Sequence, residues 1–346
     1  MTANEYLTAY SKDAERFLNS FFLKKKRLSS KIDPGLINIL QVFQDYIKGG
    51  KKARGALTVL GYQACGGKDM KAILPVSCGI ELFHSFLLIH DDIIDRDKKR
   101  RGKPTVHTHF ATKRGEHYGN SKAIIIGDVG AFLAYELILS SNFSKDRTLK
   151  AVTKLNEFLL KTGYGQLLDI DYDFKKDISW NDILKVRTYK TAFYTIVMPL
   201  SVGAILAGAD EKLLSGIEKY GIPVGIAFQL SDDILGVFGD SGKTGKSAMS
   251  DISEGKKTFL YVKALELAKG KDKKFLQRWY GAKDVNESKA KKIREIIESS
   301  GALIYSQNLA YDLVKKGKRY VGMVTKKRHF QKVLESLADF VVRREK

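Results

Sequence analysis

Apolar residues recur along this chain at intervals of three and four positions, which is the spacing of one face of an α-helix. The spacing is clear in Leu36–Ile47 and again in Phe330–Val342. Two other stretches, Ser77–Asp95 and Gly221–Leu235, are too apolar for a single stripe, so we expect helices that are buried on most sides. No stretch alternates apolar and polar residues between hairpin turns. The pattern therefore predicts an all-α fold in one domain over residues 1–346.

The breaks between these stretches predict where helices begin and end. The chain has five prolines, and we expect them at helix starts or in loops, because proline lacks the amide hydrogen that a helix interior needs. The longest apolar run, Thr195–Ala209, contains Pro199 and is shorter than the ~20 residues of a membrane span. We therefore expect a buried core helix there. The N-terminal residues carry scattered charges and lack the apolar segment of a secretory signal.

The composition indicates the cellular compartment of the protein and the charge of its surface. Hydrophobic residues make up 44% of the 346 residues, which is enough to bury a sizeable core. The two cysteines, Cys65 and Cys78, have neither metal-ligand spacing nor a disulfide framework, which favours a reducing compartment and predicts a cytoplasmic protein. The net charge of +21 indicates either a solvated lysine-rich surface or attraction to phosphates, nucleic acid or an anionic membrane.

Aspartates end the first of the two highly apolar stretches. Asp91 and Asp95 are one helical turn apart on one face, with Asp92 beside them. Carboxylates are costly at the C-terminal end of an apolar helix, where the helix dipole favours cations. The alternative is that these aspartates merely form an acidic helix end without a function. However, two carboxylates one turn apart can hold Mg²⁺ and leave room for phosphate oxygens. Arg100 and Arg101 follow, and their forked donors suit a diphosphate.

The second apolar stretch ends in the same way. Asp232 and Asp233 close it, and Gln229 lies on the same face one turn earlier. A loop rich in lysine follows, as a basic loop follows the first pair. Two such arrangements are a stronger signal than one, because two facing helices can clamp a metal cluster between them.

At this point the chain resembles a known family, the trans-isoprenyl diphosphate synthases or polyprenyl synthases, over nearly its whole length. The resemblance is carried by ordered segments: GGKKARG at 49–55, ELFH at 81–84, DDIID at 91–95, RRGKPT at 100–105, GQLLD at 165–169, KTA at 190–192, FQLSDDILG at 228–236 and SDISEGKKT at 250–258. The family implies an all-α bundle around a deep central cavity, usually in a homodimer. The second aspartate segment ends in Gly236 where many members have a third aspartate, which is similar to archaeal-type geranylgeranyl diphosphate synthases.

The resemblance also implies roles for individual residues. It assigns Mg²⁺, about three ions per active site with Mn²⁺ as a substitute, to Asp91, Asp95 and Asp232, with Asp92 and Asp233 in support. It assigns the allylic diphosphate to Arg100, Lys190 and Lys256, together with Lys246. It assigns isopentenyl diphosphate to Lys51, Arg54, His84 and Arg101, and places Thr191 and Gln229 near the reacting groups. Lys52 and Gly55 depart from the family's commoner arginine and proline, which makes Lys52 a weaker candidate than its neighbours.

The implied reaction is a prenyl transfer. An allylic diphosphate ionises, isopentenyl diphosphate attacks through its double bond, and a proton is lost, so no nucleophilic side chain is needed and the cavity must exclude water. Bulky residues shortly before the first aspartate segment form the cavity floor in this family, so Phe86, Leu87 and Phe83 are the candidates for setting chain length. Phe86 stands five positions before Asp91, which predicts geranylgeranyl diphosphate as the main product.

Other functions remain open from the sequence. Farnesyl diphosphate or a longer chain is the alternative product. A terpene cyclase would lack the isopentenyl diphosphate site, and a catalytically silent partner subunit would lack aspartates of both segments. A nucleic-acid-binding protein would leave the buried aspartates unexplained, so we expect no nucleic acid partner. The charge leaves room for peripheral contact with an anionic membrane.

Overall fold

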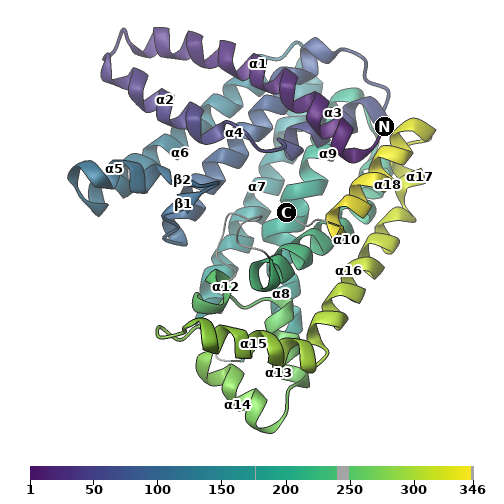
Figure 1. Cartoon of the computed structure of the whole chain (residues 1–346). Coiled ribbons are helices and arrows are strands. Elements are labelled where there is room, and N and C mark those ends of the chain that lie inside the picture. Colours follow the sequence, from purple (N-terminus) through teal and green to yellow (C-terminus); the bar gives the residue numbers. More distant parts are fainter. Residues whose placement is uncertain (176, 240–248, 344–346) are drawn as a thin grey trace. The chain divides into compact units, whose positions relative to one another are not determined.

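The computed structural model describes residues 1–175, 177–239 and 249–343, and these are almost entirely helical (Figure 1). The all-α class predicted from the sequence is therefore confirmed. The first half contains α1 (Ala3–Ser29), α2 (Gly35–Ile47), α3 (Ala53–Ala64), α4 (Met70–Ile94), β1 (Lys99–Arg100), β2 (Lys103–Pro104), α5 (Val106–Arg114), α6 (Glu116–Leu139) and α7 (Lys145–Asp173). The second half contains α8 (Trp180–Val186), the π-helix η1 (Arg187–Val197), α9 (Met198–Ala207), α10 (Glu211–Phe238), α12 (Ser250–Ser253), α13 (Phe259–Leu267), α14 (Gly270–Trp279), α15 (Glu287–Ser299), α16 (Ala302–Lys318), α17 (Val321–Val324) and α18 (Arg328–Val342).

The chain divides into two compact units. Unit 1 consists of Met1–Lys154 with Pro199–Asp210, and unit 2 consists of Leu155–Met198 with Glu211–Lys346. The chain passes from one to the other within α7 and at the start of α9. A single domain over the whole chain, as expected from the sequence, stays a prediction.

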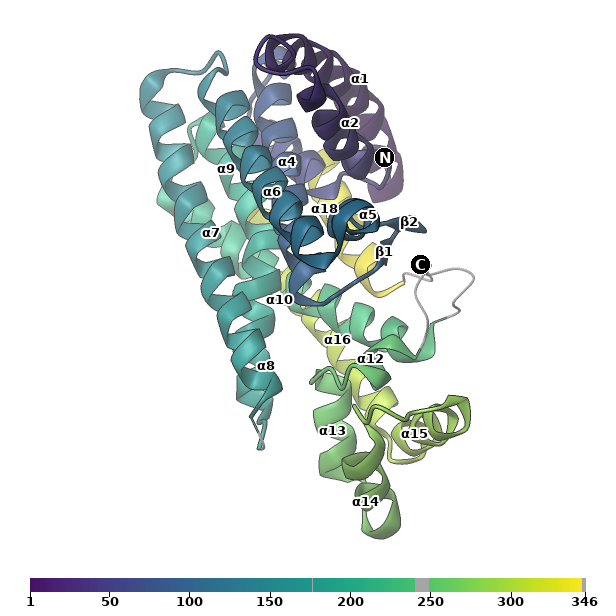
Figure 2. The same ribbon diagram turned by 90° about the vertical axis from the view of Figure 1, so that its left-hand side faces the viewer.

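Unit 1 is organised around α4 and α6, which lie side by side in both views (Figures 1 and 2). The two helices are antiparallel, because Phe83 near the middle of α4 meets Tyr135 of α6, whereas His90 near the end of α4 meets Ile124. Gly79 allows a close approach, since a Cβ there would lie 2.9 Å from the carbonyl oxygen of Ala134. Helix α4, which carries the first aspartate pair, is thus held against α6 by a contact with its backbone.

Two of the prolines were predicted wrongly. Pro75 lies inside α4 and Pro223 lies inside α10, so both helices start earlier than the apolar stretches indicated. The start of α4 is fixed by Asp69, whose side chain accepts hydrogen bonds from the amides of Lys71 and Ala72. Pro75 is tolerated because the carbonyl it leaves without a helical partner belongs to Lys71, which is exposed and near the helix end.

The short hairpin formed by β1 and β2 was not predicted from the sequence. Lys99 pairs with Pro104 and Arg100 pairs with Lys103, in antiparallel register. The two residues of the turn, Arg101 and Gly102, have φ of 52° and 75°, the left-handed region that a two-residue hairpin turn requires. Strands of two residues are too short to show an alternating pattern, which is why the hairpin was missed.

Unit 2 has two groups of packed helices. The long helix α10 packs against η1 and α16. A second apolar cluster joins the end of α10, through Val237, to helices α12 to α16, and its large buried members include Ile252, Leu260, Leu276, Tyr280, Ile293 and Ile296. The C-terminal helix α18 is tied to α10 by Tyr220, whose hydroxyl donates a 2.8 Å hydrogen bond to the carbonyl of Leu334.

Within the part of the chain that the structure describes, three helical segments are long and apolar enough to cross a membrane by length and composition alone. They are Met70–Ile94, Trp180–Ala207 and Glu211–Phe238, and 67%, 89% and 50% of their most apolar windows are buried within the protein. The run Thr195–Ala209 belongs to the second of these segments. Most of this run is buried, which agrees with the core helix expected from its length and from Pro199.

Helices α3 and α9 cross within unit 1 at a pair of buried glycines. A Cβ at Gly203 would lie 1.9 Å from the carbonyl oxygen of Thr58, and one at Gly61 would lie 2.2 Å from that of Leu200. Neither backbone oxygen can yield without moving a helix. We therefore expect Gly203→Ala to lower the free energy of unfolding by about 3 kcal/mol, measured by urea denaturation of the metal-free protein.

Gly163 of α7 provides the matched control. It is exposed and a Cβ there meets nothing within 4 Å. Gly163→Ala should stabilise the protein by about 0.5–1 kcal/mol through the unfolded state. Equal effects of the two substitutions would contradict the crossing described here.

Candidate active site

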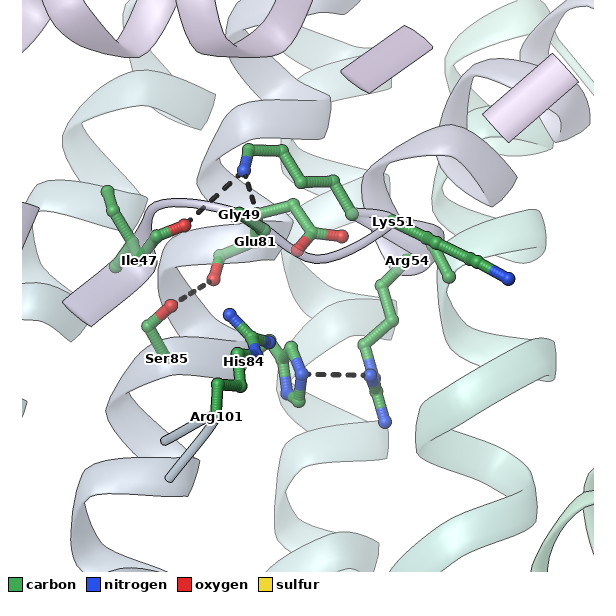
Figure 3. A pocket seen from close by; sticks show the side chains of 10 residues that line it. Ile47, Gly49, Lys51, Arg54, Glu81, His84, Ser85 and Arg101 are labelled. Carbon is green, nitrogen blue, oxygen red and sulfur yellow. Dashed lines mark hydrogen bonds between the residues drawn. The ribbon is translucent and has the colours of Figure 1, made fainter. Parts of the chain in front are cut away.

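A cationic pocket of about 130 Å³ lies in unit 1, between the loop after α2, the middle of α4 and the β1–β2 turn (Figure 3). Its lining consists of Ile47, Gly49, Lys51, Lys52, Ala53, Arg54, Glu81, His84, Ser85 and Arg101. The four residues that the family resemblance assigned to isopentenyl diphosphate, Lys51, Arg54, His84 and Arg101, are all among them. Tertiary structure thus brings together residues from three separate segments of the chain.

The loop before α3 owes its shape to left-handed backbone. Gly49 and Gly50 have φ of 77° and 69°, and Lys52 has φ of 44°, which is uncommon for a residue with a side chain. The Lys52 side chain is turned inward and is 6% exposed. Its Nζ donates to the carbonyl oxygens of Gly49 and Ile47 at 3.0 and 3.3 Å, and so caps the end of α2. Lys52 is therefore a structural cation, which agrees with its being the weaker candidate.

Gly55 has a local reason to differ from the family's commoner proline. Its amide donates a 2.6 Å hydrogen bond to Oε1 of Glu81, and proline has no such donor. The hydroxyl of Tyr10 lies 2.0 Å from where a Cβ would stand. Burial raises the pKa of Glu81, against the Gly55 hydrogen bond and the nearby cations Arg54 and Lys52.

His84 is a neutral partner of Arg54. Nη1 of Arg54 lies 3.1 Å from Nε2 of His84, and because a guanidinium can only donate, Nε2 must accept and the ring proton sits on Nδ1. Burial and the positive charges of Arg54 and Arg101 hold the pKa of His84 well below its ordinary value. The pocket therefore keeps its cations without a competing imidazolium, and three cationic side chains around one small cavity suit a polyanionic group such as a diphosphate.

Arg101 reaches this pocket because of the strained turn that carries it. Its φ is 52°, and its Nη2 lies 3.1 Å from the position of a Cβ on Gly50. Nη1 is within 3.5 Å of the carbonyl oxygen of Lys48. A non-glycine residue held in left-handed conformation costs about 1–3 kcal/mol, and here that conformation directs a guanidinium at the loop after α2.

The three carboxylates at the end of α4 have different surroundings. Asp92 is fully buried: it accepts a 2.8 Å hydrogen bond from the Tyr46 hydroxyl and a 2.6 Å hydrogen bond from Nε of Arg100. Burial raises the pKa of Asp92, and Arg100 opposes the shift. Asp91 and Asp95 are half-buried on the neighbouring face. Asp92 thus anchors the β1–β2 hairpin through Arg100, and the assignment of metal to Asp91 and Asp95 stays a prediction.

Unit 2 repeats this division at the end of α10. Asp233 is 3% exposed, whereas Asp232 is half-buried. Nε2 of Gln229 donates a 2.9 Å hydrogen bond to Oδ1 of Asp233, and the hydroxyl of Thr191 donates to Oε1 of Gln229 at 3.2 Å. The residues predicted near the reacting groups therefore form one chain of hydrogen bonds, which fixes the amide orientation of Gln229.

Sequence reasoning missed Arg187. This arginine of η1 is 8% exposed, and its Nη2 lies 3.4 Å from Oδ1 of Asp233. Burial raises the pKa of Asp233 to about 6, against the lowering by Arg187 and Gln229. The only signal available was that Arg187 precedes Lys190 by three positions, on the same helical face.

Asp169 ends the family segment GQLLD at 165–169, and the resemblance assigned no role to it. Its Oδ2 lies 2.6 Å from Nζ of Lys190, across a close contact between α7 and η1 at Gly165. Burial would raise the pKa of Asp169, but Lys190 and Arg187 hold it below its ordinary value. Asp169 therefore directs the lysine that the resemblance assigned to the allylic diphosphate.

Gly236 has a packing reason that also concerns the missing third aspartate. A Cβ at Gly236 would fall 1.9 Å from Oδ2 of Asp251, so the carboxylate of α12 lies directly against α10. Lys256 pairs with Glu254 at 2.9 Å and lies 3.7 Å from Asp251. Lys246, assigned to the allylic diphosphate, falls outside the described residues.

The donor set fits a hard divalent cation. Within residues 1–175, 177–239 and 249–343 no three His, Cys, Asp or Glu side chains converge as a ready-made metal site. Mg²⁺ does not need one, because it usually takes one or two carboxylates and completes its shell with water and substrate phosphate oxygens. Asp91 with Asp95, one turn apart beside an Arg-bound Asp92, is such a partial set.

Comparison with known proteins identifies the family of this chain. The family model described as polyprenyl synthetase matches residues 38–297. The short chain isoprenyl diphosphate synthase of Methanothermobacter thermautotrophicus is 36% identical, covering 86% of this chain and 87% of its own, and the geranylgeranyl diphosphate synthase of Sulfolobus acidocaldarius is 33% identical, covering 87% and 89%. The chain belongs to the polyprenyl synthetase family, and the prediction of a prenyltransferase is confirmed.

A solved structure extends the match to the whole fold. The geranylgeranyl pyrophosphate synthase of Corynebacterium glutamicum, complexed with isoprenyl diphosphate and magnesium, has a TM-score of 0.91 and 29% sequence identity, covering 99% of this chain and 100% of its own. The isoprenoid synthase fold expected from the sequence is therefore confirmed.

The pKa of Asp233 predicts a pH-dependent stability. Its folded value of about 6 exceeds the ordinary 3.8, so between these values the folded protein binds more protons and the free energy of unfolding falls as pH rises. Asp233→Asn removes the ionisable group and therefore this fall in the free energy of unfolding. The stability of the variant relative to wild type should therefore rise by up to about 3 kcal/mol between about pH 4 and pH 6, measured by urea denaturation with a chelator present. Asp232→Asn is the control, and a flat difference for Asp233→Asn would contradict the buried position.

Proposed function

We propose that this protein condenses isopentenyl diphosphate head to tail with allylic diphosphates, with geranylgeranyl diphosphate as the main product. The observation that carries the proposal is the cationic pocket of Lys51, Arg54 and Arg101 around neutral His84. A second diphosphate site of this kind is what distinguishes a chain-elongating synthase from a terpene cyclase. Both aspartate pairs are present, which argues against a silent partner subunit.

The residues of unit 1 would hold the homoallylic substrate. Lys51, Arg54 and Arg101 bind its diphosphate, and His84 holds the guanidinium of Arg54 in place through the 3.1 Å hydrogen bond. His84 adds no further positive charge to the pocket at neutral pH, because burial and Arg54 hold its pKa well below the ordinary value. The substrate double bond then attacks the allylic carbon as the allylic C–O bond breaks, and a proton passes to the released diphosphate.

The residues of unit 2 would bind the allylic diphosphate and its leaving group. Lys190, directed by Asp169, and Lys256 supply positive charge, and the Thr191–Gln229–Asp233 chain fixes polar groups beside them. The family resemblance also assigns Arg100 to the allylic diphosphate, and this assignment stays a prediction. Bound Mg²⁺, about three ions with Mn²⁺ as a substitute, supplies further neutralisation of the leaving diphosphate. We propose Asp91, Asp95 and Asp232 as its protein ligands.

Product length rests on the residues before the first aspartate pair. Phe83 is buried against Tyr135, with ring centroids 4.8 Å apart, so it belongs to the α4–α6 contact. Phe86 and Leu87 are only partly buried and are the better candidates for a cavity floor. An aromatic floor at Phe86 supports geranylgeranyl diphosphate, with farnesyl diphosphate or a longer chain as the alternative.

The partner and location of the enzyme are further proposals. We propose a homodimer formed through α6, whose exposed face carries Ile125, Phe132 and Leu139 with 60%, 70% and 60% of their surface exposed. These residues are seven positions apart and form one apolar stripe opposite the face that packs on α4. A cytoplasmic location agrees with Cys65 and Cys78, neither of which forms a disulfide in the described part. Peripheral contact with an anionic membrane rests on the net charge alone.

A product assay tests the function. With Mg²⁺ and labelled isopentenyl diphosphate, the protein should elongate dimethylallyl, geranyl and farnesyl diphosphates and stop at geranylgeranyl diphosphate. Lys51→Ala should raise KM for isopentenyl diphosphate by roughly tenfold or more, the loss of one charge-assisted contact, and leave KM for the allylic primer unchanged. Lys71→Ala, an exposed lysine on α4 outside the pocket, is the control. No elongation with any primer by the folded protein would sink the proposal.

Sedimentation equilibrium tests the dimer. The wild-type protein should sediment as a dimer, and Phe132→Asp should weaken the association by at least about tenfold, because the substitution places charges in an apolar interface. Ile304→Asp changes an apolar side chain that is 64% exposed on α16 and should leave the dimer intact. A monomeric wild-type protein would remove this interface from the proposal.

A further inference from the structure

His90, the residue before the first aspartate pair, crosses from α4 to the backbone of α6. Its Nε2 lies 3.1 Å from the carbonyl oxygen of Ile124, and a carbonyl can only accept, so Nε2–H is the donor. Oδ1 of Asp128 lies 3.6 Å from the same nitrogen. A helix carbonyl and a carboxylate on the next turn of α6 thus both face one imidazole nitrogen.

Gly127 completes this arrangement. A Cβ at Gly127 would lie 2.5 Å from Nε2 and 2.7 Å from Cδ2 of His90. Glycine is among the least favourable residues for a helix interior, and here it leaves the space that the imidazole ring fills. Ile124, Gly127 and Asp128 form a seat on α6 for His90, and we refer to these three residues as the α6 seat.

The ring of His90 also contacts the ring of Phe86. The ring centroids are 4.7 Å apart with an interplanar angle of 71°, an edge-to-face contact. Phe86 precedes His90 by four positions and so lies on the same side of α4. The α6 seat therefore fixes His90, and His90 in turn fixes the ring of Phe86.

We propose that His90, held on the α6 seat, is a positioning residue that sets product length through Phe86. The inference rests on the proposed function, since it concerns the floor of the chain-elongation cavity. Without the imidazole, Phe86 loses its edge-to-face partner and can turn away, which lowers the floor. His90 is also the residue next to Asp91, so its loss shifts the end of α4 that carries the aspartates.

Product analysis of full-length variants tests this role, with dimethylallyl diphosphate, labelled isopentenyl diphosphate and Mg²⁺. His90→Ala should shift the main product to a chain longer by at least one five-carbon unit and lower kcat by roughly tenfold or more, as expected for a misplaced reacting group. Phe86→Ala should lengthen the product in the same way and is the positive reference. His90→Gln, whose amide nitrogen can still donate toward Ile124 but which has no ring to contact Phe86, should lengthen the product as His90→Ala does.

Gly127→Ala approaches the same contact from α6. Its methyl group would push the imidazole aside, so it should lengthen the product in the wild-type background and change nothing further in His90→Ala, where the space is empty. His117→Ala, which removes an exposed histidine of α6, is the matched control and should leave the product unchanged.

The outcomes separate the inference from the function it rests on. A wild-type protein that elongates no primer counts against the proposed function, and the inference falls with it. A wild-type protein that elongates normally, with the same product length in His90→Ala and Gly127→Ala, overturns the inference alone. Should His90→Ala fail to fold, Gly127→Ala and His90→Gln decide the question, because each disturbs the contact of the imidazole with Phe86 and a lengthened product is required in both.

Discussion

The structure depends on a buried carboxylate paired with an arginine at the end of an apolar helix. Asp92 at the end of α4 is bound by Arg100, and Asp233 near the end of α10 lies 3.4 Å from Arg187. The folded protein would be several kcal/mol less stable if such a buried carboxylate had no cation as its partner. In each case the pairing uses one aspartate for the fold and leaves its neighbour at the partly exposed face, where a metal and a phosphate can reach it.

The arginine partners reach these carboxylates by different structural means. Arg100 comes from a two-residue strand whose turn forces Arg101 into left-handed backbone, so the same turn delivers one guanidinium to Asp92 and the next to the cationic pocket. Arg187 comes from a π-helix of 11 residues, a form that is rare and often associated with functional sites. Both devices place a charge where a regular α-helix would not.

Glycines set how closely the helices approach and therefore where the functional side chains stand. Gly165 lets α7 approach η1 near Lys190, and Gly127 leaves space on α6 for the imidazole of His90. Gly236 lets the carboxylate of Asp251 lie against α10. A side chain at this position would require the carboxylate of Asp251 to move.

The sequence by itself determined the all-α class, the two aspartate pairs and four of the residues that line the cationic pocket. These follow from local rules: helical periodicity, carboxylates one turn apart, and segments whose order resembles a family. Helix starts at Met70 and Glu211 were missed, because an interior proline near a solvated carbonyl costs less than the local rule assumes. Only the tertiary structure decided that Lys52 is a structural cation, that Arg187 and Asp169 belong to the site, and that His90 is held by α6. Each of those roles depends on burial and on a partner far away in the sequence. The neighbouring residues in the sequence reveal neither the burial nor the partner.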